Sequence, residues 1–141
     1  MKITITEIQT FNDKTGKNEI FFNPLYDPLK LVVYYNLSAD IVNVNADLSL
    51  VFEIVDFQTN KVVVNQRCWY NYVAGSGSSW FAWVGSPTPH DWGLVWTGGD
   101  VFGFRVAVEV SINLDSSGYN QTGTVAVSET RWFRVQDIFT L

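Results

Sequence analysis

The chain has 141 residues, of which 47% are hydrophobic and 16% charged, and its formal net charge is −5. This composition argues against a disordered chain, because there is ample apolar material for a core and little of the charge that keeps chains unfolded. Nucleic acid is not an expected partner, because phosphate binding needs clustered Lys and Arg, and the sequence has no such cluster. The length is that of one domain, so we expect a single domain over residues 1–141.

The N-terminal residues 1–7 alternate apolar and polar side chains from the first position. A secretory signal would instead need a basic start followed by an unbroken apolar stretch. No run of about 18 apolar residues, the length that spans a bilayer as a helix, occurs anywhere in the chain. We therefore expect a β-strand at 1–7, no membrane partner, and a cytoplasmic protein, or a secreted one only if a leader was removed.

Two-residue alternation between turn residues recurs along the middle of the chain, which is typical of a β-sandwich or barrel. Alternate residues from Leu29 to Ala39 are apolar or aromatic, and the same holds from Leu48 to Ile54. Residues 58–61, with the sequence Gln-Thr-Asn-Lys, then predict a turn into a further strand at 62–64. This part of the chain therefore predicts two strands and a hairpin.

The clearest strand in the sequence spans Val101 to Ile112, where apolar side chains occupy every second position. We expect its partner at 124–135, beyond a polar loop at 115–123. Two charged residues, Glu129 and Arg131, fall between the apolar positions of that partner. The interruption predicts a bulge or a change of sheet near Glu129.

This arrangement, which ends in a hairpin closed by the segment 129–135, resembles immunoglobulin-like and fibronectin type III domains. The resemblance implies an all-β fold, an antiparallel immunoglobulin-like β-sandwich of about seven to nine strands that forms one domain over residues 1–141. It carries no invariant motif, because the single Cys68 cannot form the cysteine pair of antibody domains. It therefore implies a fold and not an activity.

Aromatic residues are concentrated between Trp69 and Trp96, where eight of the 22 aromatic residues fall among 28 positions. A surface Trp or Tyr offers a flat apolar face with a hydrogen-bonding edge, which suits a protein partner or a sugar ring. Alternatively these side chains are buried, as large aromatics are on average. Bulky residues on both faces of the segment 80–84 favour cover by a second chain. The candidate binding residues are Trp80, Trp83, Trp92, Trp96, Tyr72, His90 and Asp91.

The sequence offers little for catalysis or metal binding. One His and one Cys are too few for a transition-metal site, and no nucleophile, base and orienting group are recognisable together. We therefore expect no cofactor, no metal and no enzymatic activity. The sequence predicts a non-enzymatic module for protein interaction or self-assembly that uses an aromatic-rich surface and strand edges. The alternative is a carbohydrate-binding module with an exposed Trp platform and a glycan as its ligand.

Overall fold

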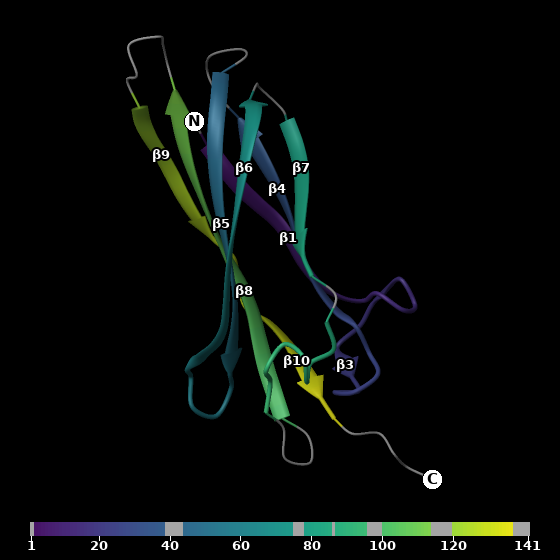
Figure 1. Ribbon diagram of the computed structural model, residues 1–141. Coiled ribbons are helices and arrows are strands. Elements are labelled where there is room, and N and C mark those ends of the chain that lie inside the picture. The colour runs from purple at the N-terminus through teal and green to yellow at the C-terminus, as the bar shows by residue number, and fades with distance from the viewer. Residues whose placement is uncertain are drawn as a thin grey trace.

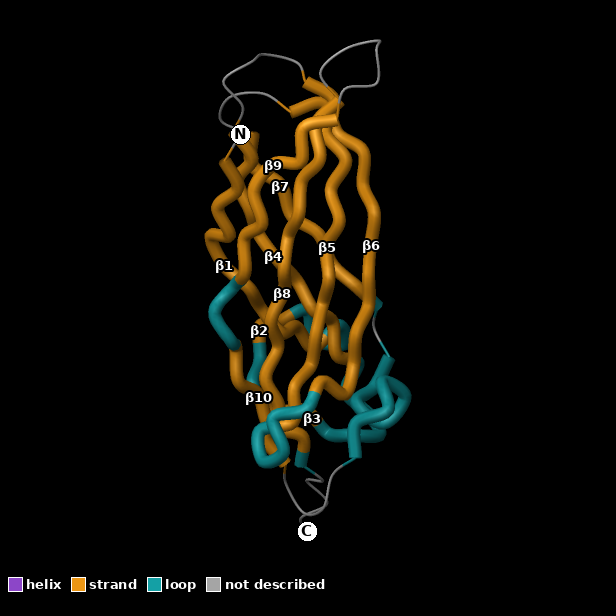
Figure 2. The backbone as a smooth tube through the Cα atoms, turned by 90° about the vertical axis from the view of Figure 1, so that its left-hand side faces the viewer, coloured by secondary structure: helices purple, strands orange, loops and turns teal. Residues whose placement is uncertain are grey.

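The computed structural model describes residues 2–38, 44–74, 78–85, 87–95, 100–113 and 120–136. In these ranges the protein is all-β, with ten strands in two sheets (Figures 1 and 2). No helix long and apolar enough to cross a membrane occurs in them. The prediction of an all-β fold is therefore confirmed.

The first sheet has the strand order β2-β1-β4-β7 and is antiparallel throughout. The second sheet has the order β3-β10-β8-β5-β6, with β9 also paired to β8, and its one parallel pair joins β3 to β10. The strands of the first sheet are β1 (Lys2–Asn12), β2 (Lys17–Asn18), β4 (Leu29–Ser38) and β7 (Ser78–Val84). Those of the second are β3 (Phe21–Phe22), β5 (Val44–Asp56), β6 (Val62–Ala74), β8 (Asp100–Asn113), β9 (Asn120–Val127) and β10 (Arg131–Val135).

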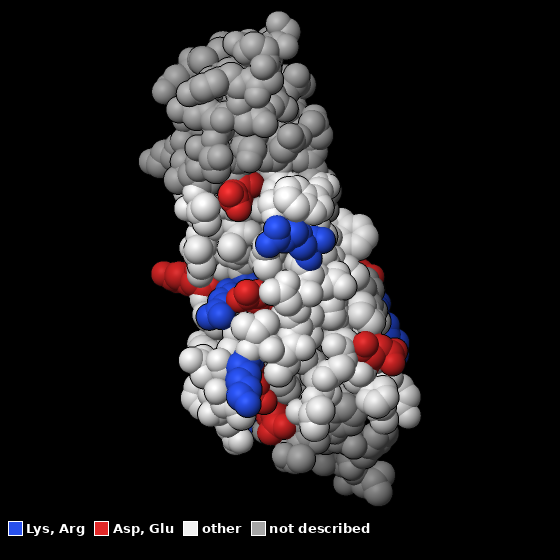
Figure 3. All heavy atoms as spheres, turned by 60° about the vertical axis from the view of Figure 1, so that its left-hand side comes forward, with Lys and Arg blue, Asp and Glu red and all other residues white. Residues whose placement is uncertain are grey.

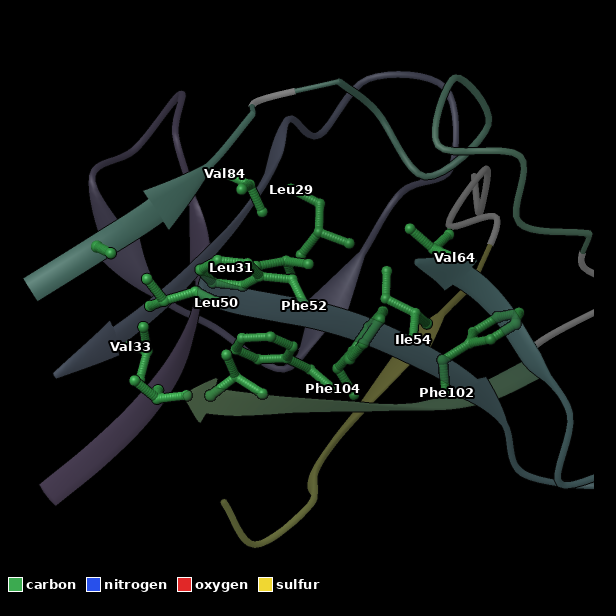
Figure 4. Close-up of a cluster of buried hydrophobic side chains, with 14 of the residues drawn as sticks. Leu29, Leu31, Val33, Leu50, Phe52, Ile54, Val64, Val84, Phe102 and Phe104 are labelled. Atoms are coloured by element: carbon green, nitrogen blue, oxygen red, sulfur yellow. The ribbon is translucent and has the colours of Figure 1, made fainter. Parts of the chain in front are cut away.

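The hydrophobic core lies between the two sheets and contains the inward-facing residues of β4, β5 and β8 (Figure 4). Each strand contributes every second residue, as expected for a sheet with one buried face. Phe52 of β5 and Phe104 of β8 stack with ring centroids 6.0 Å apart. The predicted inward faces are confirmed by complete or nearly complete burial of Leu29, Leu31, Val33, Tyr35, Leu48, Leu50, Phe52, Ile54, Phe102, Phe104, Val106 and Val108.

The predicted hairpin at 58–61 joins β5 to β6 and is confirmed. A carboxylate oxygen of Asp56 accepts backbone N–H bonds from Gln58 at 2.8 Å and from Thr59 at 3.1 Å. Asn60 has a φ of 56°, in the left-handed region that asparagine tolerates better than most residues. Local turn chemistry therefore accounts for this reversal.

The predicted strand at 124–135 is two strands, β9 and β10, separated by residues 128–130. Both strands pair with β8. Between the pairs Val127–Ala107 and Arg131–Phe104, three residues that link β9 to β10 lie opposite two residues of β8. The bulge is confirmed and the alternative change of sheet is wrong. Because the extra residue reverses the alternation, Val127 is exposed whereas Phe133 is buried.

Two loop predictions need correction. Asn120 begins β9, so the polar loop predicted at 115–123 is shorter on that side, and residues 114–119 lie outside the described ranges. The Gly/Ser-rich sequence of residues 75–79 predicts a flexible loop, but its last two residues, Ser78 and Ser79, belong to β7. Glycine and serine favour turns, but here pairing with β4 extends the strand through Ser78 and Ser79.

A tight contact at Gly103 gives a stability prediction. A Cβ at this position would lie 2.6 Å from Cγ2 of Thr130 and 2.8 Å from Cζ3 of Trp132. Gly103→Ala is therefore expected to lower the free energy of unfolding by about 1–3 kcal/mol, the usual cost of overpacking. Urea denaturation measures this. The same change in a Thr130→Ser, Trp132→Ala background should cost much less, and an equal cost there would contradict the contact.

Candidate functional site

The outer surface of the first sheet carries exposed aromatic side chains on β7 and β4. Alternation places Phe81 and Trp83 on the outer face of β7, where they are 59% and 47% exposed. In the register of the sheet, Phe81 lies opposite Tyr34 of β4, and the two ring centroids are 6.0 Å apart. We call Tyr34, Phe81 and Trp83 the β4–β7 aromatic face.

A lysine on β4 contacts one end of this face. The Nζ atom of Lys30 lies 4.2 Å from the centroid of the Trp83 ring, within the range of a cation–π interaction. Val32 lies on the same outer surface, between Trp83 and Gln9 in register, and is only 4% exposed. The large neighbouring side chains thus cover Val32 and form the outermost layer of this surface.

The β4–β7 aromatic face lies at the edge of its sheet. Among the described residues β7 pairs only with β4, and Figure 1 shows β7 as the right-hand border of the upper part of the molecule. An edge strand presents a row of backbone N–H and C=O groups that can pair with another chain. Aromatic side chains and main-chain hydrogen-bonding groups are therefore available side by side.

Trp83 is the one predicted tryptophan that the structure places on this face with a described side chain. Trp92 lies in the turn after β7, is half-buried and packs against the core. Its Nε1–H donates a hydrogen bond of 2.9 Å to the backbone carbonyl of Leu29. Its hydrogen-bonding edge is therefore used within the fold, and its ring is only partly exposed.

His90 and Asp91 are exposed in the same turn. The backbone N–H of His90 donates to the carbonyl of Pro24 at 2.9 Å, and that of Asp91 donates to the Thr88 hydroxyl at 3.3 Å. Asp91 and Trp92 also line a groove of about 390 Å³ together with β6 residues that include Asn65 and Gln66. The structure thus groups Asp91 and Trp92 with the edge of β6 and not with Trp83. His90 instead lines a separate hollow with Gly93, Leu94 and Val95.

The remaining predicted residues are only partly placed. Trp80 lies in β7 opposite Tyr35, and Tyr72 lies in β6 opposite Ala46, with only the backbone positions described. Trp96 lies outside the described residues. The aromatic residues of the segment 69–96 that the structure describes are therefore divided between the two sheets and a turn.

Sequence reasoning missed the exposed aromatic residues of the second sheet as candidates. Trp69 of β6 is 67% exposed, with the guanidinium of Arg67 5.5 Å from its ring centroid. Phe57 and Trp132 form an edge-to-face pair with centroids 5.4 Å apart. Trp132 and Phe57 fall outside the dense aromatic segment, so only the pairing of the strands brings them together.

Charged side chains do not form a continuous patch on the face shown in Figure 3, where Lys and Arg alternate with Asp and Glu. In the described part of the chain Arg105 and Glu53 form an ion pair, with their Nε and Oε2 atoms 2.8 Å apart. Within the described ranges no group of three or more His, Cys, Asp or Glu side chains could hold a metal ion. This surface therefore has mixed charge.

A second hollow, of about 910 Å³, lies between residues 3–8 of β1 and residues 126–132. Arg131 in its wall donates from Nε to the Thr10 hydroxyl at 2.9 Å and from Nη2 to the Asn18 side-chain oxygen. Burial lowers the pKa of Arg131, and nearby Glu7 opposes that effect. Because the guanidinium bridges the two sheets, we assign Arg131 a structural role.

Comparisons with known proteins add little to this description. No family model matches the chain, and no curated protein matches it. Among solved structures, a putative ApaA protein from Bordetella pertussis is similar at 12% identity and a TM-score of 0.47, over 99% of this chain and 96% of that one. A protein from Archaeoglobus fulgidus is similar at 10% identity and a TM-score of 0.44, over 94% and 98% of the two chains. Neither similarity bears on function.

The half-buried Cys68 on β6 packs against the core, and burial raises the pKa of its thiol. The thiolate is the reactive form, so we expect alkylation by iodoacetamide to have a higher pH midpoint in the folded protein than in the urea-unfolded chain. A raised pKa adds stability below the unfolded pKa that is lost as the pH rises through the folded pKa. Equal midpoints in the two states would contradict this environment.

Proposed function

We propose that this chain is a non-enzymatic module that binds protein through the β4–β7 aromatic face. The observation that carries the proposal is the exposure of Phe81 and Trp83, 59% and 47%, on a strand that forms a sheet edge. Extended polypeptides recognise such edges by main-chain hydrogen bonds, while side-chain pockets supply specificity. Exposed aromatic side chains are also the residue types that dominate the binding energy of protein interfaces.

We also propose that the two sheets have the immunoglobulin-like topology. In that scheme β1, β4 and β7 would be strands A, B and E, and β5, β6 and β8 would be C, C′ and F, with β9 and β10 together as G. The orders A-B-E and C′-C-F-G agree with the two sheets of that fold, which supports the assignment. Residues from both sheets enter one core cluster, which supports a single domain over 1–141.

A carbohydrate ligand is the second candidate. The groove of about 390 Å³ beside β6 supports it, because Asn65, Gln66 and Asp91 supply polar groups next to Trp92. Sugar recognition usually combines an aromatic face with such groups. The half-buried Trp92 and its bond to Leu29 weigh against it, since a stacking platform needs an open ring face. A glycan array tests this candidate directly, with a Gln66→Ala variant as the control for any hit.

Selection of displayed random peptides tests the protein-binding proposal. We expect the wild-type chain to select peptides that it binds with micromolar Kd, and the double variant Phe81→Ser, Trp83→Ser to bind them at least about tenfold weaker, the loss of about 1.4 kcal/mol or more expected for interface aromatics. Phe57→Ser is the matched control, because Phe57 is 60% exposed but lies in the turn after β5 in the second sheet. Peptides that bind the double variant as well as wild type would refute the proposal.

A further inference from the structure

We propose that the partner of the β4–β7 aromatic face is a second copy of this chain, docked by antiparallel pairing between the two β7 strands. This inference rests on the proposed function and names the partner. The first sheets of two copies would become one continuous sheet, β2-β1-β4-β7 followed by the same strands in reverse order. A two-fold interface of this kind needs one surface that is complementary to itself.

The edge of β7 differs from the other sheet edges. Natural edge strands are usually protected by bulges, charges or proline. The β1 edge has a register shift between Ile5 and Glu7, and the β6 edge has one opposite Ile54 and Val55. The β9 edge, which like β7 lacks charge and proline, has a shift opposite Glu109 and Ser111. The pairing of β7 with β4 continues without a shift, and the seven residues of β7 contain neither charge nor proline. Short uncharged segments of high β-propensity are those most prone to pair with another strand.

The sequence of β7 fits pairing with itself. Residues opposite each other in an antiparallel pair share a face, so a two-fold axis must pair positions of the same parity. The register that uses all seven residues centres on Phe81, which then lies opposite Phe81 of the second copy. In this register Trp83 lies opposite Ser79, and a small residue at that position leaves room for the indole. The aromatic rows of the two copies would thus join across the axis.

Charge also favours this location for the interface. The chain carries a net charge of −5, so two copies repel each other in general. Along β7 no ionisable side chain would meet its own copy at the axis. The Nζ of Lys30 lies over the Trp83 ring at 4.2 Å, but Lys30 is on β4, one strand away from the edge. Charge therefore does not oppose the close approach of two copies along β7.

Charges of either sign introduced at Phe81 test the pairing, with the mass in solution measured by sedimentation or light scattering. We expect wild type at high micromolar concentration to have twice the 16.0 kDa mass of the chain. Phe81→Lys alone and Phe81→Glu alone should each be monomeric, because like charges would meet at the axis, whereas an equal mixture of the two should regain the dimer mass. Val125→Lys and Val125→Glu are controls on the second sheet, where Val125 is 54% exposed, and both should stay dimeric.

Cysteine cross-linking tests the register. In a Cys68→Ala background, Phe81→Cys should form a covalent dimer on oxidation, because opposed Cα atoms lie about 4.5–5.5 Å apart, within disulfide range. Trp83→Cys should cross-link poorly with itself but readily with Ser79→Cys. The reverse pattern would overturn the Phe81-centred pairing.

The outcomes separate this inference from the proposed function. A monomeric wild type that still selects peptides through Phe81 and Trp83 would overturn self-pairing and leave the binding function intact. A monomer that selects none would overturn both. A dimer whose mass is unchanged by Phe81→Lys would place the interface elsewhere and overturn the inference.

Discussion

Burial of the facing side chains of two sheets holds this structure together, and the stacked rings of Phe52 and Phe104 lie within that layer. A strand can give only every second residue to the core, so the other half of each strand faces outward. On β8, for example, the outward residues Gly103, Arg105, Ala107 and Glu109 are small or charged. On β7 they include Phe81 and Trp83, and the apolar outer surface of the first sheet follows from the same alternation that builds the core.

The position of β7 in the chain explains why this surface lies at an edge. The long hairpin of β5 and β6 belongs to the second sheet, and the chain then crosses to the first sheet to pair β7 with β4. After β7 the chain turns through residues 87–95 and returns to the second sheet as β8. Among the described residues no later strand adds to β7, so its main-chain groups on one side stay available. The exposed aromatic side chains and the free main-chain edge therefore lie on the same strand, β7.

Periodicity in the sequence predicted the buried faces of β4, β5 and β8 and the turn after Asp56, because these depend on local alternation and local turn chemistry. It also located the bulge near Glu129, since charged residues interrupted an apolar face there. It could not separate Trp83 from Trp92, because one lies on an outer sheet face and the other donates a hydrogen bond to Leu29, 63 positions away in sequence. Such long-range contacts, like the pairing of Phe57 with Trp132, depend on strand order.

The central claim is that the free edge of β7 pairs with another polypeptide strand. Amide hydrogen exchange tests it most directly, because exchange reports main-chain hydrogen bonding residue by residue. As the protein concentration rises, the account predicts slower exchange at alternate amides of β7, with exchange in the central strand β5 unchanged. Exchange in β7 that is fast and independent of concentration, or that slows equally in every edge strand, would contradict the claim.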